Sequence, residues 1–139
     1  MPARNLYHDA VVEALVADGW TVTADPLWMQ FAGRDLYVDL AAERSTVAAQ
    51  KGAERIAVEV QTFAAASDVL NLQRAVGQYG VYRFVLSRTD PDRRLYMGVD
   101  EETYATVLTE PFGQALVAEF GIRLVVFDPD ARRVVRWTS

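Results

Sequence analysis

The segment RIAVEVQTF, residues 55–63, constrains the fold of this chain more than any other part of the sequence. Its apolar residues alternate, so Ile56, Val58 and Val60 would lie on one face of a β-strand and leave Glu59 on the other face. An ionised carboxylate in such a setting is costly unless it is paired or binds a cation. The segment therefore predicts a buried strand, and Glu59 is a residue that needs a partner.

Helices and strands alternate along the rest of the chain, without a linker or an internal repeat. Ser67 and Asp100 are suitable helix caps, Thr109 is a third candidate, and Pro111 suits a first helical position. The pattern predicts one domain of 139 residues, an α/β (α+β) sandwich with a mixed central β-sheet flanked by helices. The expected helices are residues 5–18, 67–87, 100–108 and 110–120. The expected strands are two short pieces within 20–31, broken at Asp25-Pro26, then 34–42, 55–63, 93–99, 122–128 and 132–138.

Composition narrows the class of protein. The chain has no cysteine, which rules out disulfides and thiolate metal sites, and it has no apolar run long enough to span a membrane. We therefore expect a soluble, cytoplasmic protein with no membrane contact. A net charge of −5 and a pI near 4.8 argue against tight, sequence-independent binding of nucleic acid. Weak binding, or binding helped by a partner or a cation, stays open.

A second carboxylate accompanies Glu59. If residues 34–42 and 55–63 form an antiparallel hairpin centred near residue 49, Asp39 lies opposite Glu59. Two facing carboxylates repel each other, so a positive group is expected between them. Mg²⁺ or Mn²⁺ is the natural candidate, because hard divalent cations take carboxylate oxygens together with water and substrate phosphates.

Other arrangements of these carboxylates are compatible with the pattern. Asp35 is an alternative to Asp39, because both residues fall on the same face of one predicted strand. A simpler alternative needs no metal: one carboxylate faces solvent, and the other pairs with an arginine such as Arg55 or Arg34.

Polar residues also recur on the long predicted helix. Arg74, Gln78 and Tyr82 are spaced four residues apart and share one face, with Asn71 on the same side. This stripe fits either a helix face that looks into a site or an ordinary solvated face. His8, the single histidine, is interpreted as a packing or capping residue.

Several segments together resemble one known family. They are MPARNLYHDAVVEALVADGW, DPLWMQFAGRDLYVDLAAE, RIAVEVQTF, AVGQYGVYR, LYMGVDEETYATVLTEPFGQALV and LVVFDP. In this order they cover nearly the whole chain and resemble the XisH family, the fdxN element excision controlling factor proteins known mainly from cyanobacteria. That family is similar to the PD-(D/E)xK nuclease superfamily. The resemblance implies a restriction-endonuclease-like sandwich.

The resemblance also implies a site made of Asp39, Glu59, Gln61, Gln78 and Tyr82. Asp39 and Glu59 match the metal ligands of the nuclease pattern, and Gln78 with Tyr82 matches a Gln and Tyr pair on the following helix. Gln61 stands where the pattern has lysine. That lysine would orient or deprotonate water and offset charge on the phosphate, whereas an amide brings no charge.

Two other residues are candidates for the missing charge. Lys51 is the single lysine of the chain, but it precedes Glu59 by too many residues unless its loop folds back. Arg74 on the helix is better placed.

Two functions follow from the resemblance. The first is an accessory factor that controls excision of a DNA element, acting with a XisI-like protein or as a homodimer, with DNA contacted directly or only in the complex. The alternative is an active Mg²⁺-dependent endonuclease. Gln61 and the acidic composition favour the first function, and the carboxylate pair favours the second.

Overall fold

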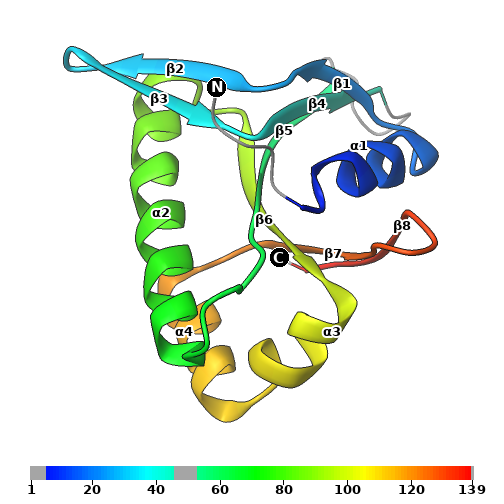
Figure 1. Cartoon of the computed structure of the whole chain (residues 1–139). Helices are drawn as coiled ribbons and strands as arrows, with labels where there is room; N and C mark the ends of the chain where they lie inside the picture. Colours follow the sequence, from blue (N-terminus) through cyan, green and yellow to red (C-terminus); the bar gives the residue numbers. More distant parts are fainter. Residues whose placement is uncertain (1–5, 46–52, 139) are drawn as a thin grey trace.

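The computed structural model describes residues 6–45 and 53–138 (Figure 1). Its helical elements are α1 (His8–Ala17), α2 (Asp68–Thr89), α3 (Glu101–Thr103), the π-helix η1 (Tyr104–Leu108) and α4 (Pro111–Phe120). Its strands are β1 (Thr21–Ala24), β2 (Leu27–Phe31), β3 (Arg34–Val38), β4 (Leu40–Arg44), β5 (Glu54–Val60), β6 (Arg94–Asp100), β7 (Leu124–Asp128) and β8 (Arg133–Trp137).

The central sheet is mixed and has the strand order β1-β4-β5-β6-β7-β8. β5, β6 and β7 are parallel neighbours, and the pairs β1/β4, β4/β5 and β7/β8 are antiparallel. β2 and β3 form a separate antiparallel hairpin that extends over the upper part of α2 (Figure 1). The predicted α+β architecture with a mixed central sheet and flanking helices is confirmed.

Two hydrophobic cores cover the two faces of the sheet. α1 packs on one face against Ile56, Val58 and Val60 of β5, while α2 and η1 cover the other face, to which Ala57 belongs. Figure 1 shows α1 and α2 on opposite sides of the sheet. β5 lies between both cores, so the predicted alternation is confirmed for residues 56–60, and Glu59 projects on the α2 side with Ala57. The strand ends at Val60, so the expected extension over residues 61–63 is wrong.

α2 begins where the sequence predicts. Ser67 is its N-cap, and the Ser67 hydroxyl accepts a hydrogen bond from the Leu70 N–H at 3.2 Å. The helix ends at Thr89, two residues beyond the expected end. In the middle of α2 the buried Tyr79 hydroxyl donates to the Leu95 carbonyl at 3.0 Å and accepts from the Arg123 N–H at 3.1 Å. This one side chain joins α2 to the start of β6 and to the residue before β7.

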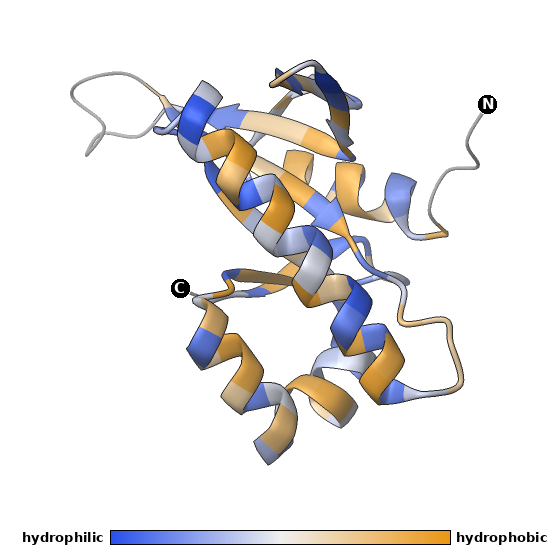
Figure 2. Cartoon of the chain, turned by 90° about the vertical axis from the view of Figure 1, so that its left-hand side faces the viewer, coloured by the Kyte–Doolittle hydropathy of each residue, from blue (hydrophilic) through white to orange (hydrophobic). Residues whose placement is uncertain are grey.

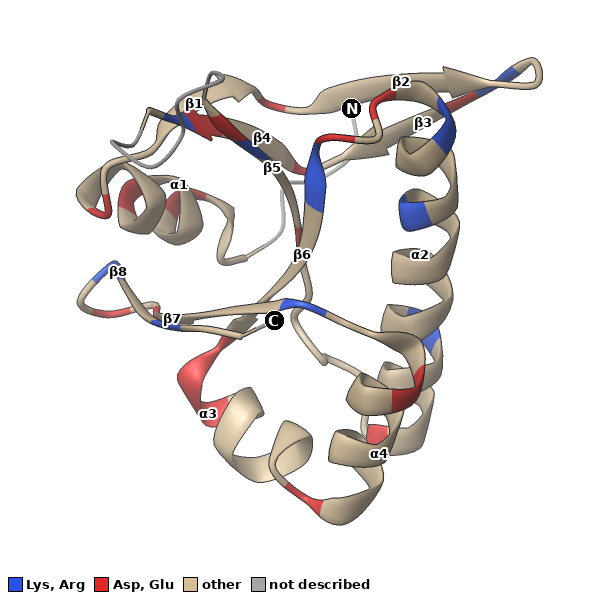
Figure 3. Cartoon of the chain, turned by 180° about the vertical axis from the view of Figure 1, so that it is seen from behind, with Lys and Arg blue, Asp and Glu red and all other residues tan. Residues whose placement is uncertain are grey.

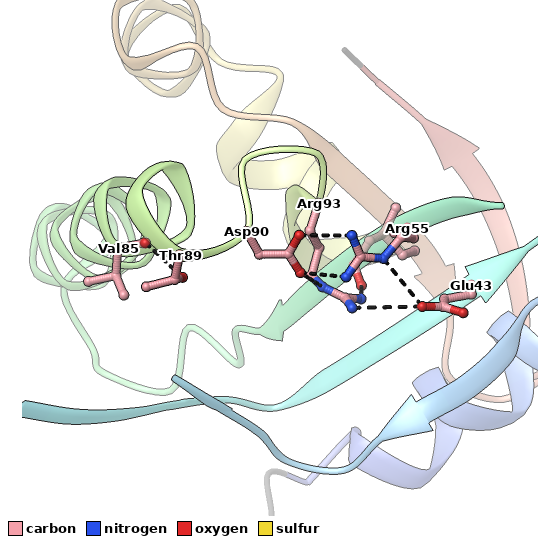
Figure 4. A network of polar contacts seen from close by, with 7 residues as sticks. Glu43, Arg55, Val85, Thr89, Asp90 and Arg93 are labelled. Carbon is pink, nitrogen blue, oxygen red and sulfur yellow. Dashed lines mark hydrogen bonds and ion pairs between the residues drawn. The ribbon is translucent and has the colours of Figure 1, made fainter. Parts of the chain in front are cut away.

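An ionic network fixes the turn between α2 and β6 (Figure 4). Arg55 donates two hydrogen bonds to the Asp90 carboxylate, at 2.8 and 2.6 Å, and one to Glu43 at 3.3 Å. Arg93 donates to Asp90 at 3.0 Å and to the Ile56 carbonyl at 2.9 Å. Forked contacts of this kind are geometrically specific, so they hold β4, β5 and the α2–β6 turn in one arrangement.

Three other details of the predicted elements are wrong. Residues 34–42 form two strands in different sheets, β3 and β4, and not one strand. The helix expected over residues 100–108 is the short α3 followed by η1. Thr109 does not cap α4: Glu110 is the N-cap, and the Thr109 hydroxyl donates back to the Ala105 carbonyl. Asp100 does cap its helix, and Pro111 occupies a first-turn position.

Within the described ranges, no helix is both long and apolar enough to cross a lipid bilayer.

The contact between α4 and η1 requires a glycine. A Cβ on the buried Gly113 would overlap the carbonyl oxygen of Val107, which is backbone and cannot move aside. We expect Gly113→Ala to lower the free energy of unfolding by about 1–3 kcal/mol, the usual cost of overpacking, as measured by chemical denaturation. Gly77→Ala is the matched control, because a Cβ there meets open space on α2 and should raise stability by up to about 1 kcal/mol. Equal effects of the two substitutions would contradict this account.

Candidate functional site

Asp39 lies at the point where the chain leaves the β2–β3 hairpin and enters the central sheet. Val38 still pairs with Leu27 of β2, and Leu40 already pairs with Val58 of β5. Between them, the Asp39 side chain accepts a hydrogen bond from the Val60 N–H at 2.9 Å. The carboxylate thus gives the Val60 N–H a hydrogen-bond partner, at a point of β5 beyond the last residue that pairs with β4.

Glu59 completes a reciprocal contact with Asp39. Its Oε2 lies 3.3 Å from the Asp39 N–H, which donates to it. The Leu40–Val58 pair continues to Arg44 opposite Glu54, so the register expected for a hairpin centred near residue 49 is confirmed. The two carboxylates are therefore brought together from the ends of β3 and β5. Lys51, the candidate compensating lysine, lies outside the described residues.

Burial and the neighbouring carboxylate change the ionisation of Glu59. Glu59 is only 8% exposed. Burial, the side-chain hydrogen bond to Asp39 and the charge of Asp39 raise the pKa of Glu59 to about 9, against a smaller opposite effect of the Asp39 N–H. At neutral pH the Glu59 side chain is therefore mostly protonated.

The arginines proposed as partners of this pair lie elsewhere. Arg55 bonds to Asp90 and Glu43, so that alternative is wrong. Arg34 is the first residue of β3 and pairs with Phe31 at the hairpin tip, about 16 Å of extended strand from Asp39.

The polar stripe of α2 is hydrogen-bonded to Gln61, two residues after Glu59. Gln61, just after β5, donates from its side-chain amide to the Gln78 carbonyl oxygen, and the Gln78 amide donates to the Tyr82 hydroxyl at 3.3 Å. Burial raises the pKa of Tyr82, and the charge of Glu59 raises it further. The five candidate residues thus form two hydrogen-bonded sets, Asp39 with Glu59 and Gln61 with Gln78 and Tyr82, and the charges of Glu59 and Asp39 act on Tyr82 across the gap between them.

The two outer members of the stripe have different positions. The buried Asn71 side chain bonds to both the N–H and the carbonyl of Ala65, at 3.0 and 2.9 Å, and so fixes the segment that joins β5 to α2. Apart from its helical spacing, no pattern in the sequence predicts this role for Asn71. Arg74 is exposed and lines a hollow of about 150 Å³ together with Gln61.

Two other candidates lie apart from this group. Asp35 is exposed on the outer face of the hairpin, where it accepts a hydrogen bond from the Trp28 ring N–H at 3.1 Å. The buried His8 belongs to α1, on the other face of the sheet, and its Nε2 lies 2.8 Å from the Asp25 carboxylate. The geometry therefore favours Asp39 over Asp35 as the neighbour of Glu59, and it agrees with a packing role for His8.

Comparison with known proteins identifies the family. The model of the XisH protein family matches residues 1–135. The chain belongs to the XisH family. Two solved structures are similar to this XisH-family chain, each with a TM-score of 0.87, 34% sequence identity and coverage of 100% of the other chain. One is an XisH family protein from Nostoc punctiforme, matched over 97% of this chain. The other is an fdxN element excision controlling factor protein from Anabaena variabilis, matched over 98%. A search of curated proteins gave no match.

The donor set of this XisH-family chain suits a cation with few protein ligands. Glu59 and Asp39 supply carboxylate oxygens, and a divalent cation could replace the proton that the buried Glu59 holds. Within residues 6–45 and 53–138, no group of three or more acidic or histidine side chains could hold a metal. A cation here would depend on water, or on a bound phosphate, for its remaining ligands, as Mg²⁺ often does.

The raised pKa of Glu59 predicts how stability depends on pH. Between the ordinary value of 4.5 and about 9, the folded chain binds more protons at Glu59 than the unfolded chain. The free energy of unfolding should therefore fall as pH rises through this window, by up to about 1.4 kcal/mol per pH unit. We expect Glu59→Gln to remove this slope and to be more stable than the wild type at pH 8. Urea denaturation at a series of pH values measures both effects.

The control for this prediction is Glu119→Gln on the exposed side of α4, which removes the same charge and should keep the slope of the wild type. A slope unchanged in Glu59→Gln would show that Glu59 does not hold the proton.

Proposed function

We propose that this chain acts as a single domain that controls the excision of a DNA element, on a scaffold related to the PD-(D/E)xK nucleases. Membership of the XisH family supports the process, because one similar structure is that of an fdxN element excision controlling factor protein. The observation that carries the nuclease-like scaffold is the contact of Asp39 with Glu59 beside the neutral Gln61.

The order of the elements supports the nuclease-like scaffold. A helix precedes the strands, Asp39 precedes the strand that bears Glu59, and α2 follows with Gln78 and Tyr82 on the site side. This is the order that the nuclease pattern requires. The parallel β5–α2–β6 connection places the ends of β5 and the polar face of α2 side by side.

Mg²⁺ or Mn²⁺ is the cation that we propose for the pair, with Asp39 and Glu59 as its protein ligands. When bound, such an ion would supply positive charge toward a DNA phosphate. Asp39 would keep its second role, since its carboxylate also accepts the Val60 N–H and is thereby held in place. Gln78 and Tyr82 would order the polar wall of the site on the α2 side.

Gln61 favours an accessory role over catalysis. Its amide is engaged with Gln78 and carries no charge, so it cannot offset negative charge on a phosphate as a lysine does. Arg74 borders the same small hollow and is the described residue best placed to substitute for that charge.

An accessory factor acts through partners, and α2 offers a surface for one. Leu70, Val81 and Phe84 on its outer side are 38%, 52% and 48% exposed. Apolar residues recur along the solvent side of this helix (Figure 2). Exposed apolar surface of this kind supports a protein partner, for which we propose a XisI-like protein or a second copy of this chain.

The alternative function is an active divalent-metal-dependent DNA endonuclease. The carboxylate pair favours it, because a buried carboxyl with a strongly raised pKa next to a second carboxylate is more common at active sites than elsewhere.

Calorimetric titration tests the metal site. We expect Mg²⁺ or Mn²⁺ to bind the wild type and to lose measurable binding in Glu59→Ala, with Glu119→Ala unchanged because that carboxylate is exposed on α4. Absence of binding to the wild type would overturn the cation site. Plasmid and single-stranded DNA are incubated with the same samples, and divalent-dependent nicking by the wild type would establish the endonuclease in place of the accessory factor.

A lysine at position 61 tests the proposed relation to the nuclease site, because it supplies the positive charge that Gln61 lacks. We expect Gln61→Lys to produce divalent-dependent nicking of plasmid DNA at a rate at least about a hundredfold above the wild type, in the range that one positioned group contributes. Gln73→Lys adds the same charge on the exposed side of α2 and should stay at the wild-type level. If Gln61→Lys is folded, binds Mg²⁺ and still leaves DNA intact, the resemblance to the nuclease site does not extend to its chemistry.

A further inference from the structure

An arginine-lined depression lies beside the N-terminal ends of the parallel strands β6 and β7. Two hollows of about 620 and 360 Å³ adjoin there, and Arg123 belongs to the lining of both. Arg83, Arg93 and Arg94 join Arg123 around the smaller hollow, where Asp92 is the acidic residue of the lining. Figure 3 shows basic segments on α2 and at the starts of β6 and β7. A chain of net charge −5 therefore concentrates positive charge in one concave place.

Two of these arginines differ from the others in their hydrogen bonds. Arg93 is bound to Asp90 and to the Ile56 carbonyl, and Arg83 donates to the Phe120 carbonyl. In the described ranges, no carboxylate or carbonyl pairs with the guanidinium groups of Arg94 and Arg123. The planar fork of an arginine side chain matches the geometry of phosphate oxygens, so these two guanidinium groups are suited to bind an anion.

The larger hollow has a different chemistry. Tyr104, Leu108 and Ile122 give it apolar surface, and Gln114 brings an amide that can both donate and accept. A volume of about 620 Å³ lies in the range of sites that hold a small organic group. Apolar and aromatic surface beside an arginine cluster fits a nucleobase next to its phosphates.

We propose that these two adjoining hollows bind a single-stranded segment of DNA, with phosphates on Arg94 and Arg123 and a base in the hollow beside Tyr104. The choice of DNA rests on the proposed function, whereas the anion site rests on the arginines alone. The surface is separate from the carboxylate pair: Glu59 pairs with Met97 of β6, and Arg94 opens the same strand about 10 Å earlier. DNA held there would be anchored away from the candidate cation.

Anisotropy of a fluorescent single-stranded oligonucleotide, titrated at several salt concentrations, tests the proposal. Each phosphate contact on a single strand contributes about 0.7 to the slope of log affinity against log salt. We expect the Arg94→Ala/Arg123→Ala double variant to lose at least about tenfold in affinity at low salt and about 1.4 in this slope. Arg133→Ala removes an exposed arginine outside the hollows and should match the wild type.

Further variants separate this site from the proposed function. Glu59→Ala should bind the oligonucleotide as the wild type does, because its carboxylate lies outside the hollows. Loss of binding in Glu59→Ala with retention in the double variant would overturn the second site and leave the proposed function standing. Retention in Glu59→Ala with loss in the double variant would support the second site, whatever the cleavage assays give. Arg94→Ala alone, at an exposed position, should lose about 0.7 in slope and keeps the test valid if the double variant does not fold.

Two results would overturn the assignment of DNA. The first is a wild type that binds no oligonucleotide at low salt. The second is displacement of the oligonucleotide by polyglutamate at an equal concentration of charge, which would make the hollows a site for an acidic peptide.

Discussion

The exchange of hydrogen bonds between Asp39 and the end of β5 is the contact on which the arrangement of this protein depends. The Asp39 N–H reaches Glu59, and its carboxylate takes the Val60 N–H. These two hydrogen bonds join the hairpin to the central sheet at Asp39. The β2–β3 pairing ends just before this residue, and the β4–β5 pairing begins just after it. The same bonds hold two carboxylates together in a buried place, so the structural joint and the candidate site are one feature.

This joint explains why charge is tolerated inside the sheet. A buried Glu59 beside Asp39 is unfavourable when both are ionised, and protonation of Glu59 lowers that cost. A divalent cation would lower it in another way.

The alternation of residues 55–63 was enough to predict β5, its two faces and the register that sets Asp39 near Glu59. It could not predict that residues 34–42 divide between two sheets, because Leu36, Val38 and Leu40 alternate across the division without a break. The sequence also could not predict the partner of Arg55. Asp90 follows Arg55 by 35 residues and contacts it only because of the turn after α2. Arg83, Arg94 and Arg123 come from three separate elements, and only the parallel order of β6 and β7 brings them to one edge.

The hairpin of β2 and β3 is inserted between β1 and β4, two strands that pair with each other. Close to its base, one pair away from Leu27 and Val38, Trp28 and Tyr37 stand opposite each other, and both side chains are more than half exposed. At its near end the last strand residue is Val38, and the next residue is Asp39. The exposed ring pair is therefore only one strand residue away from Val38, and two from Asp39. A molecule that binds these two rings and shifts the base of the hairpin would alter the spacing of Asp39 and Glu59 without touching either residue.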